Sequence, residues 1–308
     1  MVPRHDARRI PGPMAEIAAS DGNHWGGRQP LRSSGGGPSM IRLKGSGAIY
    51  GDVWFDEEPP RDPGVDIVRY CRRHAPIADA RCAPFLSLVT DLSVAADAIA
   101  GQFGKDCRYK IRRADNRDEM LVEFIMDPKD RLGEFSAFFD TFARQKAHEP
   151  SDRQWLRAAC EAGQLALTTA SRHGEALVWH AYVVAGNAVS LHYSGSCFRD
   201  RENDYRALVG RANRWLHWQD MLRFKQRGMA RYDWGGVFEE ESAPDRAGIN
   251  EFKKSFGGRT ERSYDCEVPA TLKGRIYLPL RDAWRKFRTP SNGPAETARA
   301  ESPRMTRA

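Results

Sequence analysis

The stretch RYDWGGVFEEESAPDRAGINEFKKSFGG, from Arg231 to Gly258, decides the fold. It begins as a strand, turns at a glycine pair, passes through an acidic loop and continues as a helix that ends at a second glycine pair. Gly235 and Gly236 would let the chain turn out of a sheet, because glycine accepts backbone conformations that other residues avoid. The pair at 257–258 is typical of a helix C-terminus. Ordinary turn glycines would give the same pattern.

The segments around this stretch alternate between strands and helices. Apolar runs of strand length predict strands at 49–55, 85–92, 119–125, 164–170, 175–185, 188–194 and 260–268. Helical periodicity predicts helices at 94–103 with Ser93 as N-cap, 107–117, 132–147, 152–161 and 205–226, while 65–74 fits a short helix or an extended segment. The strand at 175–185 is apolar on both faces and should be central. The sequence therefore predicts an α/β domain with a mixed, mainly antiparallel sheet and helices on both faces.

The two ends of the chain differ in composition from this core. Residues 1–39 and 289–308 are rich in Gly, Pro and Ser or lack hydrophobic periodicity, and we expect both to be disordered. Met40 directly precedes the first strand-like residues, so a translation start at Met40 is a further expectation. One domain is predicted over 40–288, with a reduced N-terminal part at 40–92 and a main part at 93–288.

Charge, hydropathy and cysteine spacing limit the classes of function. The formal net charge is +7, of which +2 lies in residues 1–40 and +1 in 289–308, which leaves a mild +4 for the core. No apolar run reaches the ~18 residues of a membrane span, and no signal peptide is evident, so the cytoplasm is the expected location. The six cysteines are scattered without metal-ligand spacing, so we expect reduced thiols and no metal.

Two ordered motifs carry a family resemblance. RYKIRRADN at Arg108–Asn116 and YDWGG…GINEFKKSFGG at Tyr232–Gly258, with the strand meander between them, resemble the GNAT acyltransferase superfamily. The similarity is to its FemAB-like branch, which includes peptidoglycan interpeptide-bridge aminoacyltransferases and the CelD-type acetyltransferases. It covers about 85–268. The resemblance implies a GNAT-like sheet whose middle strand, 175–185, diverges from the strand at 231–236 and leaves a slot for an acyl donor.

The resemblance also implies roles for residues around this slot. Backbone N–H groups near His180 to Val183 would polarise the acyl carbonyl, and transfer would be direct, without a covalent intermediate. Lys253 would stabilise the developing oxyanion or the leaving oxygen. Asp233 and His180 are candidates for proton acceptors. A loop cap explains Asp233 equally well, and a lone histidine in a strand is more often a packed core residue than a base. Substrate-binding residues would be Tyr232, Gly235, Gly236 and Phe252.

The basic helix at 107–117 adds candidate contacts to phosphate. Arg108, Arg112 and Arg113 would suit coenzyme A, a nucleotide-linked sugar or a tRNA acceptor end, unless they simply form a solvated face. The glycine loop with which GNAT enzymes bind the pyrophosphate of acetyl-CoA is missing from GSCFRDRENDYRALVG at 195–210. The co-substrate, which is not a bound cofactor, is therefore either acyl-CoA or aminoacyl-tRNA.

These features predict an acyltransferase that acts on a cell-envelope or polysaccharide precursor, with a small molecule or glycan precursor as acceptor. Two alternatives stay open. One is an acetyl-CoA-dependent N-acetyltransferase of a small amine, and the other is a non-catalytic GNAT-like module that binds tRNA or another polyanion. The sequence does not predict an oligomeric state.

Overall fold

A computed structural model describes residues 40–196, 198, 201–237 and 244–288. The segments expected to be disordered, 1–39 and 289–308, lie outside the described residues. Ten strands form one sheet in the order β1-β2-β3-β10-β4-β9-β8-β7-β6-β5. The strands are β1 (Ile41–Lys44), β2 (Ile49–Trp54), β3 (Ile67–Arg73), β4 (Arg81–Asp91), β5 (Leu121–Ile125), β6 (Leu165–Arg172), β7 (Glu175–Ala185), β8 (Ala188–Ser196), β9 (Arg231–Gly236) and β10 (Arg259–Pro269).

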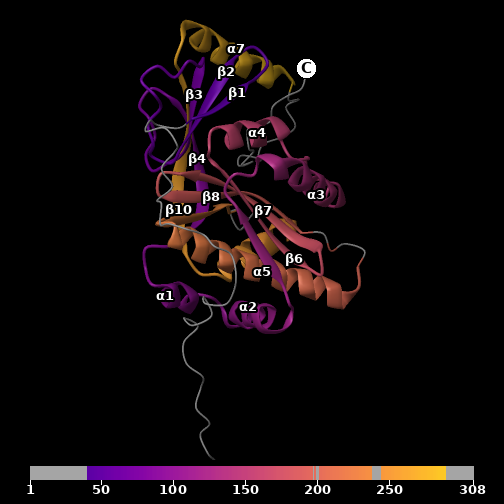
Figure 1. The fold of residues 1–308 in the computed structure, drawn as a ribbon. Helices are drawn as coiled ribbons and strands as arrows, with labels where there is room; N and C mark the ends of the chain where they lie inside the picture. The colour runs from indigo at the N-terminus through magenta and orange to yellow at the C-terminus, as the bar shows by residue number, and fades with distance from the viewer. Residues whose placement is uncertain (1–39, 197, 199–200, 238–243, 289–308) are drawn as a thin grey trace, which may run out of the picture.

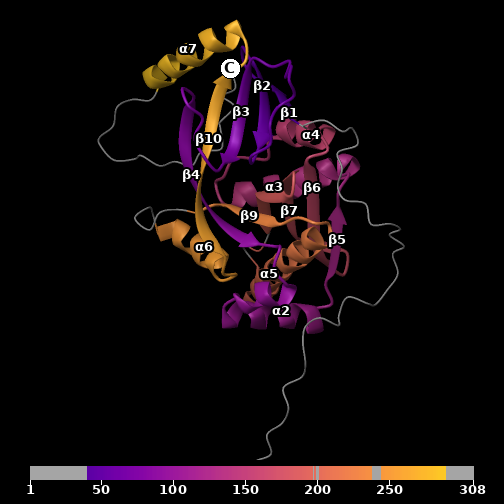
Figure 2. The ribbon, with the colours of Figure 1, turned by 90° about the vertical axis from the view of Figure 1, so that its left-hand side faces the viewer.

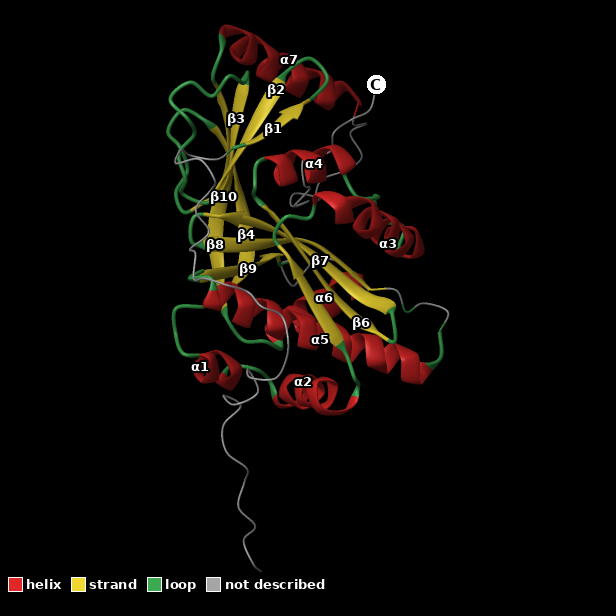
Figure 3. Cartoon of the chain, in the orientation of Figure 1, coloured by secondary structure: helices red, strands yellow, loops and turns green. Residues whose placement is uncertain are grey.

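Helices cover both faces of this sheet, as predicted (Figures 1 and 3). They are α1 (Ala96–Gly101), α2 (Lys105–Arg117), α3 (Leu132–Gln145), α4 (Arg153–Glu161), α5 (Asn203–Gln226), α6 (Pro244–Lys254) and α7 (Leu272–Arg288), with a 3-10 turn at Lys129–Arg131. Asp152 caps α4 by accepting a hydrogen bond from the Trp155 N–H at 2.9 Å. The mixed, mainly antiparallel α/β architecture is confirmed.

Two hydrophobic cores lie on opposite faces of the sheet. The first packs α1, α2 and α5 against one face and includes Tyr182, Trp218 and Trp234. The second packs α3 and α4 against the other face and includes Phe135 and Trp179. Because β7 contributes to both cores, its run from Leu177 to Ala185 is buried on both faces, as its sequence predicts.

The strand pairing is antiparallel except at β2–β3 and β8–β9, which are parallel. A parallel pair needs a crossover connection, and α5 supplies it between β8 and β9. α2 packs against α5 on the side away from the sheet (Figures 1 and 2). The β8–β9 pair thus lies near the middle of the sheet, with its crossover helix on the first core.

Several local predictions are corrected. Ser93 is not an N-cap: α1 begins later, after Ala95, and the Ser93 N–H and hydroxyl both donate to Asp91 Oδ1 at 2.8 and 2.6 Å. The segment at 65–74 contains a strand. Neither β1 nor α7 was predicted: β1 is only four residues long, and the helical periodicity of α7 was overlooked.

The expectation that all cysteines are reduced is also wrong. Cys82 on β4 and Cys266 on β10 face each other in the antiparallel register and form a disulfide. Their separation of 184 residues hid the pair in the sequence, because only the strand register brings them together. Cys71, Cys107 and Cys160 are free thiols.

Candidate active site

The site is built where β8 and β9 diverge. Only three residues of each strand pair, Ala188–Ser190 with Arg231–Asp233, and the strands carry no further mutual pairing toward their C-terminal ends. The sequence-based expectation that β9 lies beside the middle strand β7 is therefore wrong, since β8 lies between them. The donor-polarising amides that the family resemblance implies are then expected on β8 beyond Ser190, and not on β7 at His180 to Val183.

Both diverging strands are irregular at this point. On β8, Tyr193 pairs with Ala181 and Leu191 pairs with Tyr182, so His192 is an extra residue in a bulge. On β9, the register against β4 also shifts, between the Asp233 and Gly236 pairs. A bulge bends its strand and re-aims the neighbouring side chains. Two bulges facing each other thus explain why the parallel pair opens.

Gly235 and Lys253 meet at the opening. Gly235 has a φ of +73°, and a Cβ on it would lie 3.1 Å from the Leu191 carbonyl oxygen of β8 and 4.0 Å from Lys253 Nζ. Lys253 comes from the last turn of α6, and its ammonium donates a hydrogen bond to the Gly236 carbonyl oxygen at 2.6 Å. The structure therefore brings together Lys253, Gly235 and Gly236, which were selected from the sequence.

The surroundings of Lys253 lower the pKa of its side chain. The pKa of Lys253 is lowered to about 8, mainly by burial; the Asp233 charge opposes this shift and the Arg72 charge adds to it. Removing water from an ammonium disfavours its charged form. Lys253 is thus a cation at neutral pH that loses its charge within two units of it.

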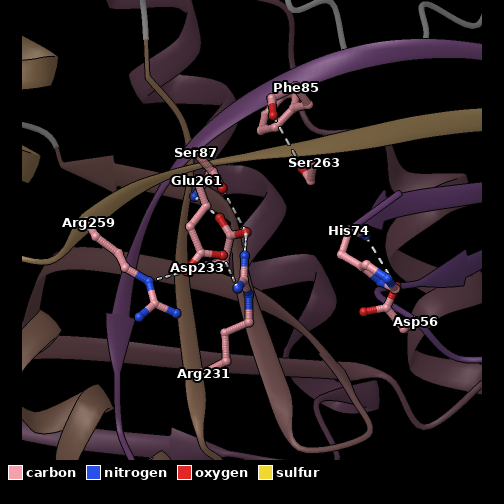
Figure 4. Close-up of polar contacts among 10 residues, drawn as sticks. Asp56, His74, Phe85, Ser87, Arg231, Asp233, Arg259, Glu261 and Ser263 are labelled. Carbon is pink, nitrogen blue, oxygen red and sulfur yellow. Dashed lines mark hydrogen bonds and ion pairs between the residues drawn. The ribbon is translucent and has the colours of Figure 1, made fainter. Parts of the chain in front are cut away.

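Asp233 is fully buried, and both of its carboxylate oxygens accept hydrogen bonds. Its Oδ1 accepts the Gly235 N–H at 2.7 Å, and its Oδ2 accepts the Ser87 hydroxyl at 3.1 Å. Arg231 lies 3.6 Å from the same carboxylate and also pairs with Glu261 (Figure 4). This carboxylate therefore fixes the turn at Gly235 that carries β9 out of the sheet.

Two residues from outside the predicted motifs, Arg72 and His192, also belong to the candidate site: Arg72 acts electrostatically on both Lys253 and His192. Arg72 on β3 is held by Asp265 at 2.5 Å and lies 3.1 Å from the ring centre of Phe85, the residue that limits the space beside Gly236. His192 stacks on Trp155 at 3.8 Å, and burial together with Arg72 lowers its pKa to about 3. His192 is therefore neutral at physiological pH.

His180 and Tyr232 lie in a separate buried network on the α5 face. Tyr232 and Asp233 are adjacent in a strand, so their side chains point to opposite faces. Tyr182 donates to Asp220 Oδ2 at 2.6 Å, and the Tyr232 hydroxyl lies 2.7 Å from Tyr182 and 2.8 Å from His217 Nδ1. Because a carboxylate only accepts, the donor order runs from His217 through Tyr232 and Tyr182 to Asp220.

His180 joins the same network through both ring nitrogens. Its Nδ1 lies 2.9 Å from Asp220 Oδ2 and its Nε2 lies 2.9 Å from Asn213 Oδ1. The structure does not bring His180 into the Lys253 and Asp233 group. Sequence spacing could not reveal this, because β7 was expected to border the slot.

This network also contains a group that could ligate a metal. Ligand atoms of His180, His217 and Asp220 lie within 4.8 Å of one another. The two imidazoles, however, stack face to face at 4.1 Å, and Asp220 Oδ2 already has Thr168, His180 and Tyr182 as hydrogen-bond partners at 2.6–3.1 Å, whereas Asp220 Oδ1 has no partner among the described residues. Stacked rings do not aim their nitrogen lone pairs at a common point, so the arrangement fits a hydrogen-bonded core better than a metal centre.

The remaining predicted binding residues lie on α2 and α6. Arg112 and Arg113 are exposed on α2, whereas Arg108 is half-buried and donates to the Gly101 carbonyl at 3.1 Å. Phe252 packs against the first core, and the Arg214 guanidinium lies 4.7 Å from its ring centre. The Gly104 N–H donates to the Ser255 carbonyl at 2.8 Å, so the N-terminus of α2 touches the end of the helix that carries Lys253.

Comparison with known proteins identifies the family of the chain. A family model described as an acetyltransferase (GNAT) domain matches residues 101–254, half of the chain. The matched range contains β8, β9 and Lys253. No curated protein matches the chain.

Two solved structures share the fold. FemX is 14% identical with a TM-score of 0.50, and the match covers 63% of this chain and 63% of FemX. The C-terminal domain of a putative lysylphosphatidylglycerol synthetase from Agrobacterium fabrum is 11% identical with a TM-score of 0.50, and the match covers 80% of this chain and 89% of that one. At these low identities the structural likeness shows a common fold and no more, and the FemAB-like resemblance is confirmed at that level.

Proposed function

We propose, from the premise that the chain belongs to the acetyltransferase (GNAT) domain family, that it transfers an acyl or aminoacyl group onto an amine or hydroxyl of a cell-envelope or polysaccharide precursor. One observation carries the proposal. Lys253, the last residue but one of the matched range, places its ammonium against the glycine pair where β9 leaves the sheet and β8 diverges from it.

The chemistry follows from this placement. The acceptor amine or hydroxyl attacks the donor carbonyl carbon, the carbonyl oxygen becomes negative, and the bond to the leaving oxygen or sulfur then breaks, while the proton that the acceptor loses ends on the leaving group. Backbone N–H groups of β8 beyond Ser190, left unpaired with β9, would stabilise that oxygen. Lys253 would stabilise the negative charge or protonate the leaving group, and Asp233 would act by holding the Gly235 turn in place. The transfer is direct, so no residue of the chain is acylated.

The first turn of α5 favours an aminoacyl ester over coenzyme A as donor. A helix N-terminus attracts phosphate through its free N–H groups. Here Glu202 is the N-cap residue and Asp204 lies in the first turn, so two carboxylates occupy the position where the pyrophosphate of coenzyme A would be expected. Arg112 and Arg113 remain exposed on α2 and suit the backbone of a tRNA acceptor end.

Turnover measurements with purified full-length protein test the proposal. Aminoacyl-tRNA and acetyl-CoA are supplied in parallel as donors, with an amino sugar and a lysine-containing peptide as acceptors. We expect Lys253→Ala to reduce transfer by about 100-fold or more, as loss of an oxyanion-stabilising group does. Lys254→Ala, which changes the adjacent exposed lysine, should retain activity.

Two results would contradict the proposal. Undiminished transfer in Lys253→Ala would remove Lys253 from the site. The second result has two parts: no transfer occurs with aminoacyl-tRNA or with acetyl-CoA, and the wild-type protein binds tRNA but the Arg112→Glu/Arg113→Glu variant does not. This result would assign the chain to the non-catalytic polyanion-binding alternative.

A further inference from the structure

The outer face of α7 is apolar. Leu272, Ile276, Leu280 and Trp284 recur at four-residue intervals, and their residue surfaces are 74%, 55%, 63% and 50% exposed. Residues four apart lie on one side of a helix. Pro279 and Ala283, both exposed, fall between them on the same side. The described part of α7 thus presents an apolar stripe, which we call the α7 stripe, along about three turns.

The inner face of α7 is held mainly by polar contacts, with the half-buried Leu278 as an apolar residue on it, whereas an ordinary surface helix turns its apolar stripe inward. The Tyr277 hydroxyl donates to the Ser46 carbonyl at 2.7 Å, and Arg281 forms two hydrogen bonds with Glu267 at 2.7 and 2.5 Å. Gly274 lies so close to Asp66 that a Cβ there would meet its carbonyl oxygen. A helix packed on a sheet normally turns its apolar side inward. The α7 stripe therefore does not serve the fold of the described residues.

The positive charge of the chain is concentrated in the same helix. Residues 272–288 contain six basic residues and one acidic residue, a net charge of +5, whereas the core from 41 to 288 carries +4 in total. The rest of the core, 41–271, is thus net −1. Lys273 and Arg275 are exposed and lie on either side of the stripe, and Lys273 also reaches Asp66 at 3.0 Å.

The position of α7 leaves this face accessible. α7 lies across the end of the sheet formed by β1, β2, β3 and β10, at the opposite end of the molecule from α1 and α2 (Figures 1 and 2). None of the described helices is long and apolar enough to cross a membrane. An amphipathic helix with basic residues beside an apolar face instead lies in the plane of a lipid–water interface.

We propose that α7 docks the protein on an anionic lipid surface, with the α7 stripe inserted at the level of the acyl chains and the flanking cations at the headgroups. Charge decides between this occupant and a second copy of the chain. Two copies paired through the α7 stripe would bring like charges together along both flanks, whereas anionic headgroups neutralise them. The inference is independent of the acyl-transfer proposal.

Vesicle flotation of the full-length protein tests the docking. We expect binding to vesicles that contain phosphatidylglycerol and little binding to phosphatidylcholine alone. Ile276→Glu/Leu280→Glu should reduce the bound fraction more than about tenfold, because the variant lacks two large apolar side chains that would move from water into the lipid on binding. Leu121→Glu is the matched control: Leu121 is 67% exposed on β5, and its change should leave binding intact.

Two outcomes would overturn the proposal. One is that the wild-type protein does not float with anionic vesicles, or that the α7 variant and Leu121→Glu float equally. The other is a concentration-dependent dimer that the α7 variant abolishes, which would assign the stripe to a second copy. Transfer to a water-soluble acceptor, measured on the same samples, keeps these outcomes separate from a failure of the acyl-transfer proposal.

Discussion

At the scale of single residues, the site depends on a glycine and a lysine from adjacent elements. Gly235 turns β9 in a left-handed conformation, and the absence of a side chain leaves room between the Leu191 carbonyl and Lys253 Nζ. Lys253 reaches this room because α6 ends beside it and its ammonium binds the Gly236 carbonyl. Both residues were selected at the level of sequence: Gly235 because it belongs to a glycine pair at a strand end, and Lys253 because of the family resemblance.

The pH dependence of transfer should follow Lys253. Its pKa is lowered to about 8, so the ammonium is present below that pH and is lost above it. If the cation is required, kcat/KM falls as the pH rises through about 8. Lys253→Arg keeps a positive charge over this range, since the pKa of arginine lies above ~12, and its profile should lose the falling limb. A limb that persists unchanged in Lys253→Arg would show that another group titrates.

Substitution of Gly235 should impair transfer more than folding. Gly235→Ala places a Cβ in the opening and imposes a left-handed conformation that costs about 1–2 kcal/mol of folding free energy. Gly174→Ala at the β6–β7 turn is the control, because its φ is +80° and a Cβ there meets nothing within 4 Å. Urea unfolding should show a loss for both variants, the larger one for Gly235→Ala because its Cβ also meets the Leu191 carbonyl oxygen, while kcat/KM falls by about tenfold or more only in Gly235→Ala. Equal activities would contradict the placement of the site.

At the scale of elements, the divergence of β8 and β9 is held by buried polar contacts on both faces. On one face Asp233 links β9 to β4 through Ser87. On the other, the chain from His217 through Tyr232 and Tyr182 to Asp220 joins β9, β7 and α5. Burial and the Asp220 charge raise the pKa of Tyr182 far above its usual value, so this hydroxyl stays protonated as a donor.

Breaking that network should cost stability. Tyr182→Phe removes the hydroxyl that donates to Asp220 and leaves a buried carboxylate with fewer partners, so we expect a loss of about 1–3 kcal/mol in the free energy of unfolding. Tyr109→Phe on α2 is the matched control, because Tyr109 is 54% exposed and should change stability by less than about 0.5 kcal/mol. Equal midpoints in urea for the two variants would show that the network adds no net stability.

Most elements could be predicted from the sequence, but the neighbours of the key strands could not. Hydrophobic periodicity located β6, β7, β8 and α5, because the apolar residues within each of these elements are the ones that the fold buries. The pairing of β9 with β8 depends on a crossover and two bulges, which leave no local signal at His192. His180 was assigned to the slot because the sequence did not reveal that β8 lies between β7 and β9.

At the scale of the whole molecule, distant segments are joined across the sheet. β10 connects the end of α6 to α7 and pairs with both β3 and β4, and the Cys82–Cys266 disulfide links it to β4. Arg72 and Asp265, on β3 and β10, meet beside the site. The sequence analysis assigned no candidate site residue to the N-terminal part at 40–92, because contacts between residues 193 apart have no signature in a single chain.

The division of the domain into an N-terminal part at 40–92 and a main part at 93–288 remains a proposal. β3 and β4 from the first range pair with β10 from the second in one continuous sheet. A single sheet of ten strands gives the site contributions from both ranges.

Hydrogen–deuterium exchange of the full-length protein with and without donor tests the central claim most directly. Aminoacyl-tRNA and acetyl-CoA are compared at saturating concentration. If the acyl donor binds where β8 and β9 diverge, at least one donor should slow exchange in peptides covering 191–196 and 232–237. Protection of neither peptide with either donor, or protection confined to α2, would contradict the account.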